Sequence, residues 1–389
     1  MKKALLAMED GEVNDEAIVA TPAEELPEET AAISQELTEV SADQNQLVEA
    51  ADISDSLDGY ADMARESTQP GEGGEEAPGF TDEQAEAVEV AMEHFRKRLG
   101  ITRLKMPAME AYSTDRVNTT KLALEEIQNL QARLDKKLSL AQEGLGGRIT
   151  NAIRRTFKTN KGMRNEIRNL NIDALDKEPR SLGEPAWGRI FSLFVKQGEK
   201  ADAAVVLKTI QLYNHSSEGK LKEVIKAAST ALDEIDRELK RQMIGSADGA
   251  VSSIAAHEKK VLALCEGLRS ELPGDYKENA FDIEVISCDR TKFKAIAHEI
   301  EVGAHTTEIE RLYSKYLWSA YELDISRQPT GGIAGAVVDI AKLAHADRRA
   351  AMKAVRNISR ELDSIMEEFL SSYQKAVWGA YRYLTVSAK

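Results

Sequence analysis

The sequence has few cysteines and no long apolar run. Cys265 and Cys288 are its two cysteines among 389 residues, which is too few for a disulfide framework, and no C-x-x-C spacing offers a metal site. We therefore expect a reducing compartment. No run approaches the ~18–20 apolar residues that a membrane-spanning helix requires, so no membrane span is predicted. The apolar stretch at residues 4–8 is too short for an export signal, and we expect a chain that is not secreted.

Motifs that carry enzyme chemistry are also missing. The histidines form no HExxH arrangement, and Gly303 is expected to break the helix between His298 and His305, so no metal site is predicted. Residues 330–335 lack the Lys-Ser/Thr pair of a phosphate-binding loop and predict a turn before a helix. Cys265 lies on an apolar helix face, which is typical of a core residue. The sequence predicts no catalytic residue, no cofactor and no enzyme.

The chain does have a sharp division of charge. Residues 1–110 hold 27 Asp and Glu against 8 Lys and Arg, whereas residues 111–389 hold 39 against 43. The first part therefore carries −19 and the second +4, which together give the net charge of −15. Between residues 9 and 79 the chain is too acidic and too poor in apolar residues to offset the entropy of ordering. We predict a mostly disordered acidic segment over 1–110, with a short helix such as 31–47.

One stronger helix is predicted near 82–99, towards the end of this segment. Thr81 and Gln84 form a capping-box pair, and Gly100 follows a basic last turn. Apolar residues recur on one face of the helix, namely Val88, Ala91, Met92, Phe95 and Leu99. Such a helix could dock on the rest of the chain or on a partner. On composition alone, the segment could also be a solubilising tail with one helix.

Residues 111–389 predict a helical body. Apolar residues recur at helical spacing from 122 to 141, and Gly144 is expected to end that helix. The clearest amphipathic stripe covers 221–243, with 251–272 as its neighbour in the bundle. We take the body to be one region that follows the acidic segment.

The fold class is mainly α, with one exception. Residues 281–286 alternate like a strand, and with 297–302 they predict a small β-hairpin near 281–302. A long last helix is expected from 347 to 384. We therefore predict a multi-helix bundle with a small β-hairpin, preceded by a largely disordered acidic N-terminal segment.

A basic helix is predicted within the body, between residues 148 and 168. Its only acid is Glu166, and its seven cations are Arg148, Arg154, Arg155, Lys158, Lys161, Arg164 and Arg168. Such a face could contact phosphates of DNA, acidic protein or anionic lipid, or it could simply be solvated. The chain's own acidic segment is a natural partner, because opposite charges attract.

The triplet Ala-Met-Glu occurs three times in the chain. The copies are Ala7-Met8-Glu9, Ala91-Met92-Glu93 and Ala108-Met109-Glu110. Small-x-Glu triplets arise easily by chance in an acidic chain, so the triplet sequence alone does not identify a cleavage site. The third copy stands out by position, because charge and patterning both change there.

With this layout the chain resembles the internal head proteins of phiKZ-like giant phages. In that family an acidic propeptide is removed by the phage prohead protease after a small-x-Glu triplet, and the mature helical protein stays in the capsid with the DNA. Residues 113–127, just after the junction, also look similar to the start of the mature region there.

The resemblance implies specific residues and partners. Cleavage would fall between Glu110 and Ala111, with Ala108 as the small residue of the triplet and Met109 between them. Secondary cuts would follow the two other triplets. The implied partners are the prohead protease, other capsid and inner-core proteins, and packaged DNA. The implied location is the capsid interior of the virion, after synthesis in the host cytoplasm, with ejection into the host as a further step.

Two other functions stay open on the sequence. The first is a non-enzymatic helical scaffold or adaptor that keeps the acidic segment as a permanent arm. An intact chain of 42.9 kDa in the mature particle or in a cell would favour it. The second is an enzyme released into the host, with an unrecognised site in the body. Loss of an activity on replacing His257 or His298 would favour it.

Overall fold

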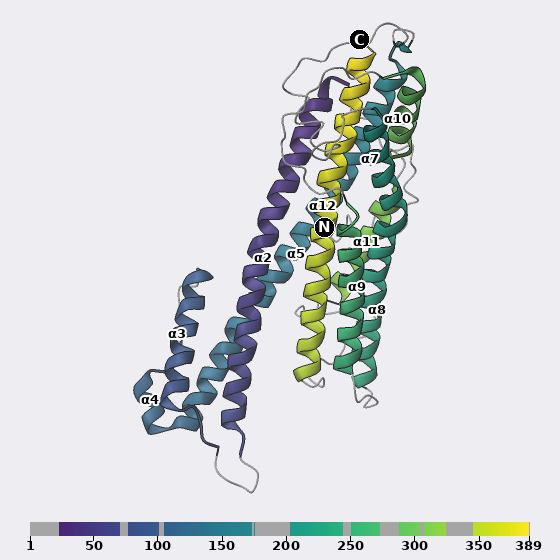
Figure 1. The fold of residues 1–389 in the computed structure, drawn as a ribbon. Coiled ribbons are helices and arrows are strands. Elements are labelled where there is room, and N and C mark those ends of the chain that lie inside the picture. Colours follow the sequence, from purple (N-terminus) through teal and green to yellow (C-terminus); the bar gives the residue numbers. More distant parts are fainter. Residues whose placement is uncertain are drawn as a thin grey trace. The chain divides into compact units, whose positions relative to one another are not determined.

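The described chain consists of helices and their connections (Figure 1). The structure, a computed structural model, describes residues 23–70, 77–100, 105–172, 175, 203–243, 250–272, 288–303, 307–323 and 345–388. The mainly α fold class is confirmed. The chain divides into two compact units: Asp43–Gly144 with Ile325–Gly332, and Met1–Ala42 with Leu145–Asp324 and Ile333–Lys389.

The predicted β-hairpin is wrong. Residues 297–302 lie within helix α10 (Arg290–Gly303), and residues 281–286 lie outside the described part of the chain. The helical period prevails because Phe293, Ile296 and Ile300 fall on one face and are all buried there. Gly303 ends this helix, as the sequence predicts.

The prediction of a mostly disordered acidic segment is wrong for its described residues. Helix α2 (Leu26–Thr68) runs for 43 residues through this segment and extends well beyond the short helix expected at 31–47. Buried apolar residues recur along it at steps of three, four or seven, with a gap after Val40: Leu26, Ile33, Leu37, Val40, Ile53, Leu57, Ala61 and Ala64. These residues are too sparse to change the composition. At 100° per residue the set from Leu26 to Val40 and the set from Ile53 to Ala64 fall on different faces of the helix, and packing of each face stabilises it.

The unit that contains Asp43–Gly144 is built from four helical pieces. These are the second part of α2, α3 (Asp82–Arg98), the short α4 (Met109–Thr114) and the first part of α5 (Arg116–Arg168). The Thr81 and Gln84 capping box of α3 is present, with each side chain bonded to the other residue's backbone N–H, which confirms this predicted start. Apolar residues of all four pieces share one core.

The other unit contains the predicted bundle. Its described helices include α7 (Ala203–Ser216), the π-helical turn η4 (Ser217–Leu221), α8 (Lys222–Met243), α9 (Ala250–Arg269), α11 (Thr307–Glu322) and α12 (His345–Ser387). α9 packs against both α8 and α12, and α11 packs against α8. The predicted helices at 221–243, 251–272 and 347–384 are therefore confirmed, with ends shifted by a few residues.

Helix α5 does not end at Gly144, contrary to the sequence prediction. It continues through four glycines (Gly144, Gly146, Gly147 and Gly162) to Arg168. One reason is visible at Gly146, where a Cβ atom would lie 2.5 Å from a methyl carbon of Leu317. The side chain of Leu317 occupies the space that a Cβ would need, and this packing against α11 offsets the low helix propensity of the glycine.

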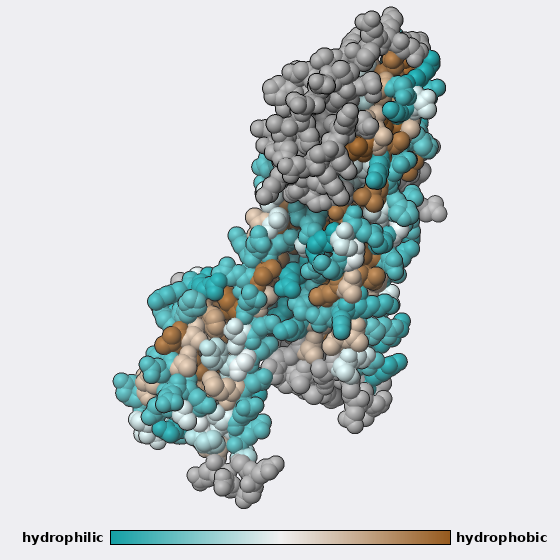
Figure 2. Space-filling model, in the orientation of Figure 1, coloured by the Kyte–Doolittle hydropathy of each residue, from teal (hydrophilic) through white to brown (hydrophobic). Residues whose placement is uncertain are grey.

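The described surface is largely hydrophilic on the face that Figure 2 shows. Among the described residues, the large apolar side chains that are exposed are Val90, Leu122, Leu140 and Leu212. They are scattered along the sequence, as single apolar residues on protein surfaces commonly are. Within the described helices, none is both long enough and apolar enough to cross a lipid bilayer.

Candidate functional site

The junction predicted from the sequence lies where an extended stretch enters α4. Residues 105–108 are not helical, and Ala108 has φ −68° and ψ 149°, an extended conformation. Ala108 and Glu110 are exposed, whereas Met109 is half-buried. No side chain caps the start of α4, which is six residues long. A helix of this length has little stability of its own.

The Glu110–Ala111 peptide bond takes part in the hydrogen bonds of α4. The Ala111 N–H donates to the Ala108 carbonyl at 2.9 Å. The Glu110 carbonyl accepts from the hydroxyls of Ser113 at 2.7 Å and Thr114 at 3.1 Å. A protease that binds its substrate in an extended form would have to unwind this turn, at the cost of these bonds.

Tyr112 fixes α4 to the core two residues after Glu110. Its side chain is 2 % exposed, and its ring centroid lies 6.2 Å from that of Phe80. Burial raises the pKa of the Tyr112 hydroxyl to about 12, with a smaller contribution from the charge of Glu89. The junction is thus exposed at the triplet and anchored just beyond it.

The other two triplets are placed differently. Ala91-Met92-Glu93 lies in the middle of α3, where Met92 is fully buried and Arg96 donates to Glu93 at 2.7 Å. The hydrogen bond from Arg96 lowers the pKa of the Glu93 carboxyl. Cutting there would require α3 to unfold from the core. Ala7-Met8-Glu9 lies outside the described residues.

The predicted basic helix is the second part of α5, and most of its sides are buried. Ile149, Ile153 and Phe157 lie in the core as expected, but Thr156, Thr159 and Asn160 are buried too. Among the seven cations, Lys161 is buried, Arg155, Lys158 and Arg164 are half-buried, and Arg148, Arg154 and Arg168 are exposed. A helix so enclosed offers only separate cations to a partner, rather than a continuous basic face.

Several of these cations bind glutamates of the same chain. Arg154 donates to Glu310 at 2.6 Å, and Arg168 pairs with Glu301. Arg155 bridges two acids of α2, donating to Glu29 at 2.7 Å and to Glu36 at 2.8 Å.

The bridge shifts the pKa values of Glu29 and Arg155. The hydrogen bond from Arg155 lowers the pKa of the Glu29 carboxyl, and the same bond raises the pKa of Arg155. Because Glu29 and Glu36 belong to the acidic segment, the predicted attraction between that segment and the basic helix is present at Arg155.

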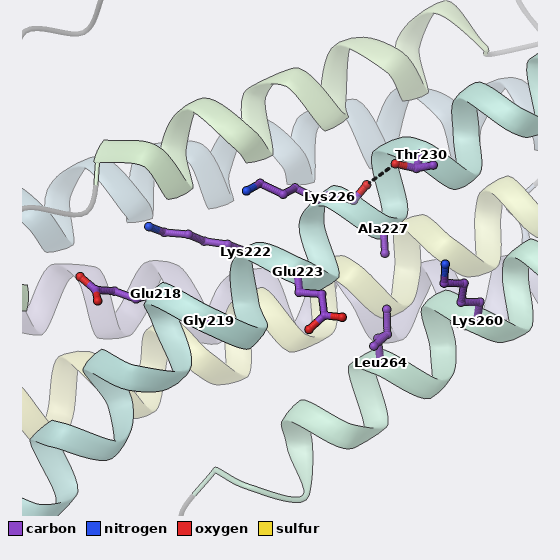
Figure 3. Close-up of a pocket in the computed structure, with 9 residues that line it drawn as sticks. All are labelled: Glu218, Gly219, Lys222, Glu223, Lys226, Ala227, Thr230, Lys260 and Leu264. Atoms are coloured by element: carbon purple, nitrogen blue, oxygen red, sulfur yellow. Dashed lines mark hydrogen bonds between the residues drawn. The ribbon is translucent and has the colours of Figure 1, made fainter.

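A groove of about 410 Å³ lies along the start of α8 (Figure 3). It is lined by Glu218, Gly219, Lys222, Glu223, Lys226, Ala227, Thr230, Lys260 and Leu264. Lys222 donates to Glu308 on α11 at 2.6 Å, and Lys226 lies 4.0 Å from the same carboxylate. The hydrogen bond from Lys222 lowers the pKa of Glu308. Two of the three lysines therefore already serve to join α8 to α11, and the groove is a mixed-charge surface.

The cysteines and histidines form no reactive group within the described chain. Burial raises the pKa of the Cys265 thiol to about 12 and that of Cys288 to about 11, so both are poor nucleophiles at neutral pH. Among the described residues, no three His, Cys, Asp or Glu side chains gather as a metal site would require. Residues 330–335 lie outside the described residues, as does His305.

One buried polar cluster was missed by the sequence analysis. Asp363 of α12 is 3 % exposed and accepts a hydrogen bond from the Tyr313 hydroxyl at 2.6 Å. Close by, the Tyr316 hydroxyl donates to Ser359 at 2.7 Å. Burial raises the pKa of Asp363 to about 7. The sequence signal was available, since Asp363 falls on the buried side of α12 beside Leu362, but an acid at such a position is easily assigned to the surface.

No protein-family model, no curated protein and no solved structure matches the chain.

Proposed function

We propose that this protein is a structural, non-enzymatic internal head protein of a giant phage. It is made as a precursor, cut by the prohead protease between Glu110 and Ala111, and packaged with the genome in the capsid interior. Its other partners there are capsid and inner-core proteins and packaged DNA, and the mature body is a candidate for ejection into the host. The resemblance at the junction and the division of charge at the same place motivate this function.

The accessibility of the junction is the observation that supports it most. Ala108 and Glu110 are exposed, the residues before them are extended, and α4 is short and uncapped. The identical triplet in α3 has a buried methionine and a paired glutamate. Because proteases act on segments that unfold locally at low cost, this difference favours the bond after Glu110 over the bond after Glu93.

Co-expression with the prohead protease of a phiKZ-like phage tests this function. We expect two fragments, with the second beginning at Ala111. Glu110→Gln should abolish that cut, and Glu93→Gln, the matched change in the other triplet, should leave it in place. An uncut wild-type chain, or cleavage of the Glu110→Gln variant at the same bond, would contradict the proposal.

A second candidate function is favoured by a different observation. Helix α2 is long, has buried apolar residues in both of its halves and is bridged to Arg155, so residues 26–68 of the acidic segment are a folded part of the protein. A helical scaffold or adaptor that keeps this segment permanently would need such contacts. An intact chain of 42.9 kDa in the mature particle would favour this second function over the first.

A further inference from the structure

The two sides of the Glu110–Ala111 bond share one hydrophobic core. Its buried members before the bond are Ile53, Leu57, Ala61, Ala64, Phe80, Ala85, Val88, Met92 and Phe95. Its buried members after the bond are Tyr112, Ala123, Ile127, Leu130, Leu134 and Leu138. All of them are at most 8 % exposed, so separating the two sides would return most of this apolar surface to water.

Polar contacts also connect the two sides. The Phe80 N–H donates to the Thr120 hydroxyl at 2.8 Å, a buried hydrogen bond. Arg116 donates to Asp82 at 2.7 Å, next to the start of α3. A buried N–H that loses its acceptor is costly, so the first of these bonds opposes separation.

The Arg155 bridge adds a contact farther along the chain. Arg155 follows the cut, whereas its partners Glu29 and Glu36 precede it. The three side chains are between 19 % and 33 % exposed. Partial burial makes the loss of one partner more costly than at an open surface, because the remaining charges stay half-desolvated.

We propose that residues 26–98 stay bound to the body after the Glu110–Ala111 bond is cut, as the second chain of a non-covalent helical complex. This inference rests on the proposed function for the cut itself. Hydrolysis consumes one water and leaves the carboxylate of Glu110 and the amino group of Ala111. The shared core does not depend on that bond, so release of the acidic helices needs a second event, namely their unfolding or degradation.

The test uses the full-length chain with the recognition sequence of a site-specific protease inserted after Glu110. The purified protein is cut and passed over a size-exclusion column with light scattering. We expect both pieces to elute together with the mass of the whole chain. Elution as two separate species overturns the inference. If circular dichroism shows that this insertion lowers the helix content before cutting, the same sequence is placed after Gly100, where it also separates residues 26–98 from the body.

Arg155→Ala supplies a second readout. We expect it to weaken the association of the cut pieces by about tenfold, because Glu29 and Glu36 lose their shared partner. The matched control is Arg237→Ala, since Arg237 pairs with Glu234 on its own helix. If the cut pieces of the two variants associate with equal affinity, the Arg155 bridge does not contribute to the association.

The two proposals fail separately. A chain that is never cut in its native particle refutes the proposed function and leaves the column experiment unaffected. Separation of the pieces on the column refutes the bound complex and leaves the cut itself in place.

Discussion

Asp363 is the residue at which the structure makes the clearest prediction about pH. Its carboxyl is buried, and the groups that face it are the hydroxyls of Tyr313 and, less directly, Tyr316. Burial raises its pKa from 3.8 to about 7 in the folded chain. The folded state therefore holds a proton more tightly than the unfolded state, and this group makes the free energy of unfolding fall as the pH rises from about 4 to about 7.

Asp363→Asn should flatten that dependence. Asparagine keeps an acceptor for Tyr313 and carries no charge at any pH. Between pH 5 and pH 8 we expect the wild type to lose about 2–3 kcal/mol of stability relative to this variant, from about 1.4 kcal/mol for each pH unit between pH 5 and the folded pKa. Urea unfolding at pH 5 and pH 8 measures the difference, with the exposed Asp233→Asn on α8 as control. If the free energy of unfolding changes equally with pH in the wild type and in Asp363→Asn, the Asp363 carboxyl does not cause the pH dependence.

Gly303 is a second position where a single added carbon atom is expected to change the stability of the fold. A Cβ atom there would collide with the Tyr373 hydroxyl and would lie 2.9 Å from Oδ1 of Asn214. We expect Gly303→Ala to destabilise the fold by about 1–3 kcal/mol, as overpacking usually does. Gly267→Ala in α9 is the matched control, since nothing lies within 4 Å of its Cβ position.

The control substitution has a predicted effect of its own. Alanine is the better helix former, so Gly267→Ala should stabilise the protein by about 0.5–1 kcal/mol. Thermal unfolding of both variants gives opposite shifts of the melting temperature if this account is right. A stable Gly303→Ala protein would mean that Tyr373 can move without loss of the hydrogen bond that it donates to Gly303.

Among the helices, α4 is the one whose stability should govern cutting at the junction. It is anchored through Tyr112, which packs on Phe80. Phe80→Ala should loosen α4 and raise the rate of cleavage after Glu110 by a glutamate-specific protease by about tenfold or more, because local opening becomes cheaper. Mass spectrometry of the products at early times measures that rate.

A control separates local loosening from general instability. Phe293 is equally buried, in α10 of the other compact unit. Phe293→Ala should leave the rate of cleavage after Glu110 close to that of the wild type. If both variants speed this cut equally, global unfolding rather than α4 controls access.

The helices differ in how well the sequence predicts them. The capping box at Thr81 and the dense stripes of α8 and α12 predict helices to within a few residues. Most of helix α2 was not predicted, because its apolar residues are few among many acids. The composition of this segment is therefore that of a disordered chain. What decides its structure is the partner face that it packs on, and that partner lies elsewhere in the sequence.

At the junction, too, local sequence features are predictable and contacts between distant residues are not. Composition and the triplet locate it at Ala108-Met109-Glu110, and the structure adds exposure and a short helix there. The role of Arg155 could not be predicted residue by residue, because its partners Glu29 and Glu36 lie more than 100 positions away. Opposite charge predicted the attraction, but not which cation carries it.

For the whole chain, apolar packing outweighs charge in holding the acidic segment. Each buried large apolar side chain contributes about 1.5–3 kcal/mol. A half-exposed ion pair contributes about 0.2–1 kcal/mol. Six of the nine buried residues before Glu110 in the shared core are larger than alanine, so the described part of the acidic segment is held mainly by apolar packing. Its charge then sets solubility and long-range attraction rather than the fold.

The proposed function depends on cleavage of the bond between Glu110 and Ala111. N-terminal sequencing of the chain from its native particle tests it most directly. We predict a mature chain that begins Ala111-Tyr112-Ser113, with or without peptides from residues 26–98 alongside it. An intact chain, with no fragment that begins at Ala111, would contradict it.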